Sequence, residues 1–293
     1  MSPPLLLADV PWLLYRSYFA LPKSITDAEG RPVNALLGTV NTILSLYETP
    51  PPSGPPRAVL ACLGAEEATY RVNLYPPYHA HRDPMPPELA YQWKQAPRLL
   101  EGLGWQVPTS GDLEADDVMY SFARDESEGA GRALLLTADR DLYGAVDDHV
   151  AVLELGKAGQ PSVEIGPEQV RERYGVGPEQ VPDFIALRGD PSDGLPGAPG
   201  IGAKTAAQLL RDHGSLEGLL AAAEKEDAAG LRPRIASALK ENAQLLRDFK
   251  HIATLQTIPV DPPPENSTNF ATGAKVVEEL GMPRLAARLK SLS

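Results

Sequence analysis

Short apolar runs alternate with longer amphipathic stretches through the first half of the chain, and this alternation restricts the fold more than any other feature. The apolar runs predict strands at 5–7, 59–63, 105–107, 133–136 and 150–153. The stretches near 11–21, 34–47, 88–103 and 112–123 have helical periodicity. Strands separated by helices of this length predict a parallel sheet covered on both faces. In such sheets ligands bind at the carboxyl ends of the strands.

From about Gly166 onward the pattern becomes almost purely helical. The string Gly-Pro-Glu-Gln-Val occurs at 166–170 and 177–181, and we interpret the copies as two similar helix starts, because proline followed by an acid favours a helix N-terminus. Further helices are predicted at 203–213, 215–223 and 234–256, with one weak helix near the C-terminus. The predicted fold class is α/β, with an α/β domain over residues 1–165 and a helical domain over residues 166–293.

Carboxylates occur in four groups, each at a predicted strand end, helix start or loop. Each group alone has an ordinary interpretation, since an Asp after a strand is often a helix cap and the helix dipole favours acids in a first turn. Together they bring many like charges to one end of a sheet, where they repel strongly in a low dielectric. The groups are Asp9; Glu114, Asp116 and Asp117; Asp139 and Asp141; and Asp190 and Asp193.

Divalent cations would remove this repulsion. Mg²⁺ and Mn²⁺ take oxygen ligands, and two such ions can hold a phosphodiester for an in-line displacement. The carboxylates therefore predict a site for two or more Mg²⁺ or Mn²⁺ ions.

A glycine-rich segment at 197–206 stands before a predicted helix. Glycines let backbone N–H groups approach a ligand, and a helix N-terminus suits a phosphate. A nucleotide-binding P-loop is excluded because Ala203 stands where that motif needs lysine. We therefore expect a helix-turn-helix hairpin that grips a nucleic-acid backbone, in preference to a plain turn between helices. Its candidate DNA-binding residues are Gly197, Gly200, Gly202, Lys204 and Thr205.

Four strings resemble the motifs of bacterial 5′→3′ exonucleases and flap endonucleases, a family that includes the 5′-nuclease domain of DNA polymerase I. They are DVPWLLYRSYFALP at 9–22, LEADDV at 113–118, TADRDL at 137–142 and LRGDPSDGLPGAPGIGAKTA at 187–206. The resemblance implies a PIN-like α/β domain followed by a helical domain with a helix-three-turn-helix element. It also implies that Asp190 and Asp193 of the helical domain complete the metal site.

The resemblance further assigns roles to individual residues. It makes all eight carboxylates metal ligands, and it makes the 197–204 loop the grip on the DNA duplex, where the family often holds a potassium ion. Arg71 and Arg82 match basic positions beside the scissile phosphate, so the resemblance makes them catalytic. Two positions depart from the family: Gly64 stands where a metal-binding Asp is usual, and His79 stands where a phosphate-contacting Lys is usual.

Three functions fit these residues. The first is a metal-dependent 5′ nuclease that acts on 5′ ends, flaps or junctions of DNA. The second is a junction-binding protein of the same fold that has lost catalysis through Gly64 and His79. The third is a PIN-type ribonuclease, and the DNA-gripping helical half counts against it. Eight electrostatically costly carboxylates have no purpose in binding alone, so the sequence favours the nuclease.

The composition of the chain argues against several classes of protein and of binding site. The formal net charge is −12, which argues against a general nucleic-acid coat but leaves room for a local basic site. The single cysteine, Cys62, excludes an intramolecular disulfide and a multi-cysteine zinc site. The chain has no recognisable signal peptide and no apolar run long enough to span a membrane. We expect a cytoplasmic monomer without a membrane partner.

Overall fold

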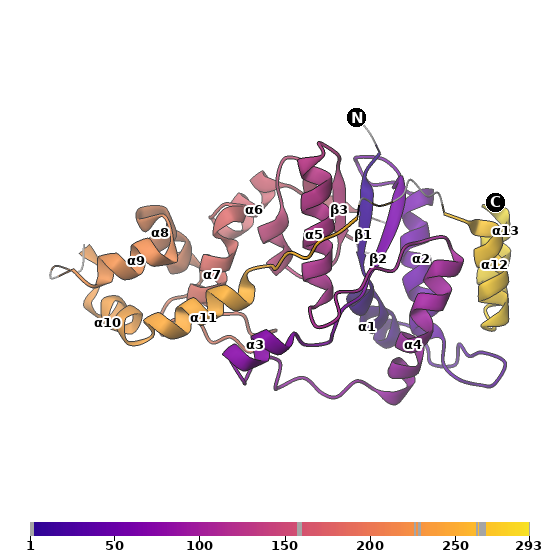
Figure 1. The fold of residues 1–293 in the computed structure, drawn as a ribbon, viewed down its shortest axis with the longest axis horizontal. Helices are drawn as coiled ribbons and strands as arrows, with labels where there is room; N and C mark the ends of the chain where they lie inside the picture. Colours follow the sequence, from indigo (N-terminus) through magenta and orange to yellow (C-terminus); the bar gives the residue numbers. More distant parts are fainter. Residues whose placement is uncertain are drawn as a thin grey trace.

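A five-stranded sheet forms the centre of the molecule (Figure 1). The structure is a computed structural model, and it describes residues 3–156, 160–225, 227, 230–261, 263 and 268–292. The strand order is β2-β1-β3-β4-β5, in which only β5 is antiparallel to its neighbour. The strands are β1 (Leu5–Asp9), β2 (Ala58–Cys62), β3 (Ala133–Leu136), β4 (Val150–Glu154) and β5 (Val163–Ile165). The predicted parallel α/β sheet is confirmed.

The strand predicted at 105–107 is wrong. Gln106 makes only an isolated bridge with Leu60, although its carbonyl accepts the N–H of Ala61 at 2.8 Å. A second isolated bridge joins Leu63 to Thr109, and Pro108 between the two bridges has no N–H to donate, so no continuous strand forms. The short strand β5 was not predicted.

Helices cover both faces of the sheet. Successive side chains of β1 point to opposite faces, so each face of the sheet has its own apolar core. Leu5 and Leu7 pack in one core with α5, while Leu6 and Ala8 pack in the other with α1, α2 and α4. These helices are α1 (Val10–Ala20), α2 (Asn34–Glu48), α4 (Pro87–Gly102) and α5 (Ala115–Glu128), and the short α3 (Thr69–Leu74) precedes α4. The carboxyl ends of the parallel strands stay open between the layers.

A group of helices extends from one side of the sheet (Figure 1). Its members are α6 (Pro167–Tyr174), α7 (Val181–Arg188), α8 (Ala203–His213), α9 (Leu216–Ala223), α10 (Pro233–Glu241) and α11 (Ala243–Ala253). The two Gly-Pro-Glu-Gln-Val copies are two helix starts, as predicted, since one begins α6 and the other leads through a 3-10 turn into α7. The single helix predicted at 234–256 breaks at Asn242, whose side chain donates to the Ala238 carbonyl at 2.8 Å.

Two helices, where one was predicted, form the C-terminal part. They are α12 (Phe270–Glu279) and α13 (Pro283–Ser291), and they pack beside α4 at the opposite end of the molecule from α8–α10 (Figure 1). They therefore join the core of the sheet, apart from the other helices of the second half. The division into domains at 165/166 stays a prediction. Within the described ranges, every helix is too short or too polar to cross a bilayer.

Candidate active site

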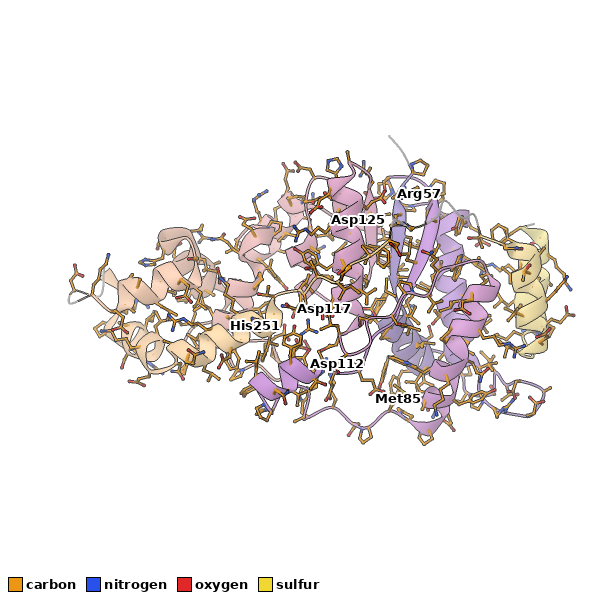
Figure 2. The ribbon with its side chains drawn as sticks, viewed as in Figure 1. Arg57, Met85, Asp112, Asp117, Asp125 and His251 are labelled. Atoms are coloured by element: carbon orange, nitrogen blue, oxygen red, sulfur yellow. The ribbon has the colours of Figure 1, made fainter. Side chains whose placement is uncertain are left out.

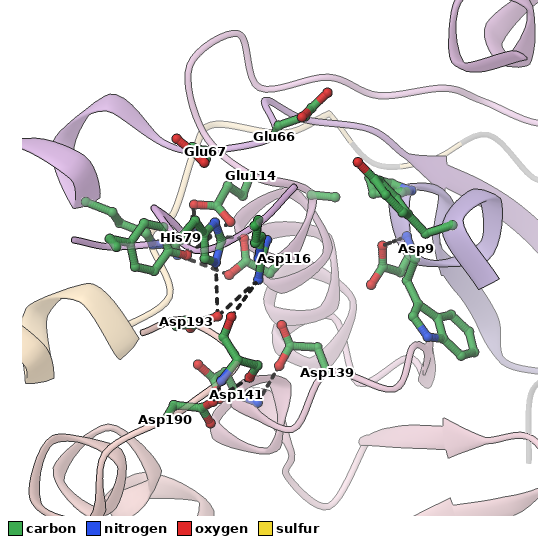
Figure 3. A pocket seen from close by; sticks show the side chains of 18 of the residues that line it. Asp9, Glu66, Glu67, His79, Glu114, Asp116, Asp139, Asp141, Asp190 and Asp193 are labelled. Carbon is green, nitrogen blue, oxygen red and sulfur yellow. Dashed lines mark hydrogen bonds and ion pairs between the residues drawn. The ribbon is translucent and has the colours of Figure 1, made fainter. Parts of the chain in front are cut away.

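Seven of the eight predicted carboxylates line one cavity of about 1340 Å³ at the carboxyl end of the sheet (Figure 3). One residue ends β1, two belong to the start of α5, two follow β3, and two come from the loop after α7. In Figure 3 Asp9 stands on one side of the cavity and the other acids stand across from it. The seven are Asp9, Glu114, Asp116, Asp139, Asp141, Asp190 and Asp193.

Asp9 is both a helix cap and a member of this cluster. Its Oδ1 accepts the N–H of Trp12 at 3.0 Å, and its Oδ2 accepts the hydroxyl of Thr137 at 2.7 Å. Thr137 also accepts the N–H of Asp139 at 3.0 Å, so it links the ends of β1 and β3. Asp9 therefore caps α1 and also stands among the cavity acids, and its role as a metal ligand stays a prediction.

Burial opposes the ionisation of Asp9, Asp139 and Asp141 in this cavity. Burial raises the pKa of Asp9 to about 6. Burial also raises the pKa of Asp139 to about 8, with the neighbouring charge of Asp193 as the next cause. The pKa of Asp141 is raised well above its ordinary value by burial and by Asp139. Such carboxylates suit a site where divalent cations supply the missing positive charge.

The donor set fits hard cations that keep part of their water shell. Among the residues that the structure describes, no three His, Cys, Asp or Glu side chains converge closely enough to hold an ion by themselves. Mg²⁺ commonly takes one or two protein carboxylates directly and keeps several waters. The oxygen-only, partly separated donors of this cavity fit that mode of binding.

Arg71 pairs with the acids at the start of α5. Its Nη1 is 2.8 Å from Glu114 Oε1 and its Nη2 is 3.0 Å from Asp116 Oδ2, and only 2% of the side chain is exposed. Its guanidinium is therefore engaged by protein carboxylates, where the resemblance implied contact with a phosphate. Arg82, by contrast, is about half exposed at the cavity wall, 3.3 Å from Asp193 Oδ1. Both predicted catalytic arginines line the cavity, and Arg82 is the more exposed of the two.

Asp117 is the one predicted ligand that does not line the cavity. It is fully buried, and its Oδ1 accepts the backbone N–H of Gln256 at 2.7 Å and contacts Arg71 Nη2 at 3.1 Å. One residue corresponds to a rotation of about 100° around an α-helix. Asp116 therefore faces the cavity while Asp117 points toward the segment after α11.

His79 pairs with the acidic loop. Its ring is buried against Tyr78 at a centroid distance of 3.8 Å, and its Nε2 lies 3.0 Å from Asp193 Oδ1. Its backbone has a φ of 54° and donates to the Asp193 carbonyl at 3.1 Å. A lysine at this position would have to displace these contacts, so His79 holds the loop and does not simply leave a phosphate contact vacant.

Three further residues of the site were not predicted. The hydroxyl of Tyr78 donates to Glu114 Oε1 at 3.2 Å, and Arg188 Nη2 lies 2.9 Å from Asp190 Oδ2. Thr137 joins two strand ends, as described above. Thr137 and Arg188 stand inside recognised motifs, and Tyr78 precedes His79, one of the positions that depart from the family.

Gly64 has no space for a side chain. A Cβ there would lie 2.5 Å from the backbone nitrogen of Ala115 and 2.5 Å from the carbonyl carbon of Glu114. The end of β2 thus packs directly on the start of α5. The absence of an Asp at this position is part of the local packing, and restoring it cannot simply add a metal ligand.

Gly64→Asp is therefore expected to destabilise the protein without improving metal binding. Overpacking against backbone typically costs about 1–3 kcal/mol, because α5 must move to admit the side chain. Thermal unfolding and a Mn²⁺ titration would measure the two effects. A variant of wild-type stability that binds Mn²⁺ more tightly would contradict this packing argument.

The glycine-rich loop presents an open helix N-terminus. Gly202 is the N-cap of α8 without a capping side chain, and a Cβ on it would meet nothing within 4 Å. Gly197 and Gly200 have φ values of 70° and 81°, which favour glycine. The N–H groups of the first turn, which includes Lys204 and Thr205, are thus accessible to an anion.

Two family models match consecutive parts of the chain. Residues 4–175 match the 5′-3′ exonuclease N-terminal resolvase-like domain, and residues 176–269 match the 5′-3′ exonuclease C-terminal SAM fold. A Mycobacterium tuberculosis protein named 5′-3′ exonuclease is 33% identical over 316 residues, covering 99% of this chain and 98% of that protein. The thermostable DNA polymerase I of Thermus thermophilus is 37% identical over 256 residues, covering 87% of this chain. The chain matches only 28% or 29% of the length of such polymerases.

Solved structures share the fold at lower identity. The T5 D15 protein co-crystallised with metal ions has a TM-score of 0.68 at 17% identity, and the match covers 98% of both chains. The catalytic core of Rad2 in complex with DNA substrate has a TM-score of 0.64 at 13% identity, covering 100% of this chain and 93% of that chain. These matches confirm the predicted fold class of an α/β domain followed by helices.

Proposed function

The chain belongs to the 5′-3′ exonuclease family, and we propose that it is a divalent-metal-dependent 5′ nuclease. Its substrate is DNA with 5′ ends, flaps or junctions, and its reaction is phosphodiester hydrolysis. The observation that best supports this proposal is the set of seven carboxylates that line one cavity. The DNA-bound and metal-bound relatives of the same fold add support.

The residues of the cavity have distinct roles in this proposal. The seven carboxylates hold two or more Mg²⁺ or Mn²⁺ ions, which supply Lewis-acid chemistry when bound. Arg82 neutralises charge on the phosphoryl oxygens. Tyr78 and His79 orient Glu114 and Asp193 through the hydrogen bonds described above. The N-terminus of α8 takes a phosphate of the duplex, which positions the scissile bond at the acids.

Cleavage of a 5′-flap substrate tests the proposal. Single-turnover assays over a range of Mn²⁺ concentrations should yield products shortened from the 5′ end, and chelation should abolish the reaction. A wild-type protein that binds the junction but cleaves at no metal concentration would instead be the junction-binding protein. Monomeric state, cytoplasmic location, the choice between Mg²⁺ and Mn²⁺ and a potassium ion at the glycine-rich loop stay predictions.

Gly202→Val is expected to weaken binding to duplex-containing substrates by about tenfold or more, equivalent to about 1.4 kcal/mol. The valine has space in the folded protein, yet it stands where a phosphate would approach α8. Binding of a short single strand should change much less, and thermal unfolding should be nearly unaffected. Equal losses on both substrates would mean that the loop has no specific role with the duplex.

A further inference from the structure

A buried carboxylate on α5 holds the chain that leaves the helical group. Asp117 is fully buried, and its Oδ1 accepts the N–H of Gln256, whereas Asp116 beside it lines the cavity. Figure 2 shows Asp117 at the lower end of α5, near the end of α11 that carries His251. We call residues 252–258 the exit segment, because they carry the chain away from α11. Two adjacent carboxylates of one helix thus serve two different parts of the molecule.

Arg71 connects the same two parts. Its Nε donates to the carbonyl of Ile252, in the last turn of α11, at 3.2 Å. Its Nη1 and Nη2 bind Glu114 and Asp116 at the cavity, and Nη2 also contacts Asp117. Charge-assisted hydrogen bonds of this kind fix the orientation of a guanidinium. One buried side chain therefore touches both the exit segment and the cavity acids.

The attachment continues along the next turn of α5. Ser121 Oγ accepts the N–H of Ile258 at 3.0 Å and donates to the carbonyl of Asp117 at 2.7 Å. Behind the exit segment, α11 packs on α7, where Lys250 Nζ lies 2.6 Å from the buried Asp183. Helix α7 leads directly into the loop that carries the cavity acids Asp190 and Asp193. The position of this loop relative to α5 thus depends on how the exit segment is held.

We propose that Asp117 and Arg71 are positioning residues, which hold the exit segment on α5 and so set the separation between Asp116 and the acids of the 189–195 loop. The inference rests on the proposed nuclease function, because the acids need a defined separation only if they act together. Asp117 is then not a metal ligand, although the family resemblance placed it among them. Its carboxylate works through Gln256 and Arg71 and touches no substrate.

The experiment compares Asp117→Asn and Asp117→Ala with the matched control Asp116→Asn. Asparagine at 117 still accepts the Gln256 N–H, so Mn²⁺ affinity measured by paramagnetic resonance should stay within about threefold of wild type, while Asp116→Asn loses about tenfold or more. Asp117→Ala should speed hydrogen exchange of the Gln256 amide by about tenfold or more. Asp117→Ala should also lower kcat about tenfold with little change in the KM for DNA. In Asp117→Asn, both the exchange of the Gln256 amide and kcat should stay close to the wild-type values.

Ser121→Ala removes the hydrogen bond to the Ile258 N–H without removing a charge. It replaces Asp117→Ala as the test variant if Asp117→Ala does not fold. It should speed exchange of the Ile258 amide and lower kcat. The inference is overturned if Asp117→Asn loses as much Mn²⁺ affinity as Asp116→Asn, or if exit-segment exchange is unchanged in the variants that fold. If Asp116→Asn keeps full Mn²⁺ affinity, the proposed function fails, while the exchange measurements still decide whether Asp117 holds the exit segment.

Discussion

Replacing Asp139 or Asp116 by asparagine is expected to lower the rate of DNA cleavage by about a thousandfold or more, equivalent to about 4 kcal/mol of transition-state stabilisation. Each substitution removes one charge from the carboxylate set and keeps its volume. In the wild type, Asp139 Oδ1 accepts the N–H of Asp141 at 2.9 Å. The amide oxygen of an asparagine at position 139 can accept the same N–H. Single-turnover cleavage of a labelled 5′-flap would measure the loss.

Stability measurements distinguish the loss of a metal ligand from the loss of the folded structure. Because burial raises the pKa of Asp139 to about 8, its ionisation opposes folding at neutral pH. Asp139→Asn is therefore expected to raise the free energy of unfolding of the metal-free protein slightly, because solvent at this exposed position screens part of the effect. The matched control Asp148→Asn, at an exposed position before β4, should change neither property. Wild-type turnover in Asp139→Asn would refute the metal assignment.

The gathering of the strand-end acids could be predicted from local pattern, whereas the family resemblance added Asp190 and Asp193. An apolar run that ends in Asp9 or leads to Asp139 marks the carboxyl end of a strand, and parallel strands bring such ends together. The open start of α8 likewise follows from the glycines before it. These features depend on residues close in sequence, so periodicity and spacing were sufficient.

The remaining features depend on contacts between distant segments, which the sequence does not show. Asp116 and Asp117 are neighbours of the same type on two faces of α5, and the partner of Asp117 is Gln256, 139 residues further on. The closed space at Gly64 depends on the position of α5. The burial of Arg71 depends on the acids above it and on the end of α11. Local pattern therefore located the site but could not separate ligands from the residues that support them.

Without divalent ions, the stability of the protein is expected to fall as the pH rises from 5 to 8. Asp9 and Asp139 have pKa values of about 6 and about 8 in the folded state, above the ordinary 3.8, so the folded protein binds their protons more tightly than the unfolded chain. Stability is then greatest at low pH and is lost as each group is forced to ionise, by at most about 1.4 kcal/mol per pH unit for each carboxyl. Carboxyls with lowered pKa, such as Asp27 and Glu154, titrate below this window.

Mn²⁺ should reverse this trend, because a bound cation favours the ionised carboxylates that the metal-free fold resists. Saturating Mn²⁺ is expected to raise the Tm at pH 8 by roughly 5–10 °C, and by much less at pH 5, where protons compete for the same oxygens. Differential scanning calorimetry in chelator and in Mn²⁺ would measure both curves, and Asp139→Asn should show a flatter pH dependence and a smaller metal shift. A metal-free Tm that rises from pH 5 to 8, or a Mn²⁺ shift of equal size at both pH values, would show that the cavity acids are not the groups that bind the ions.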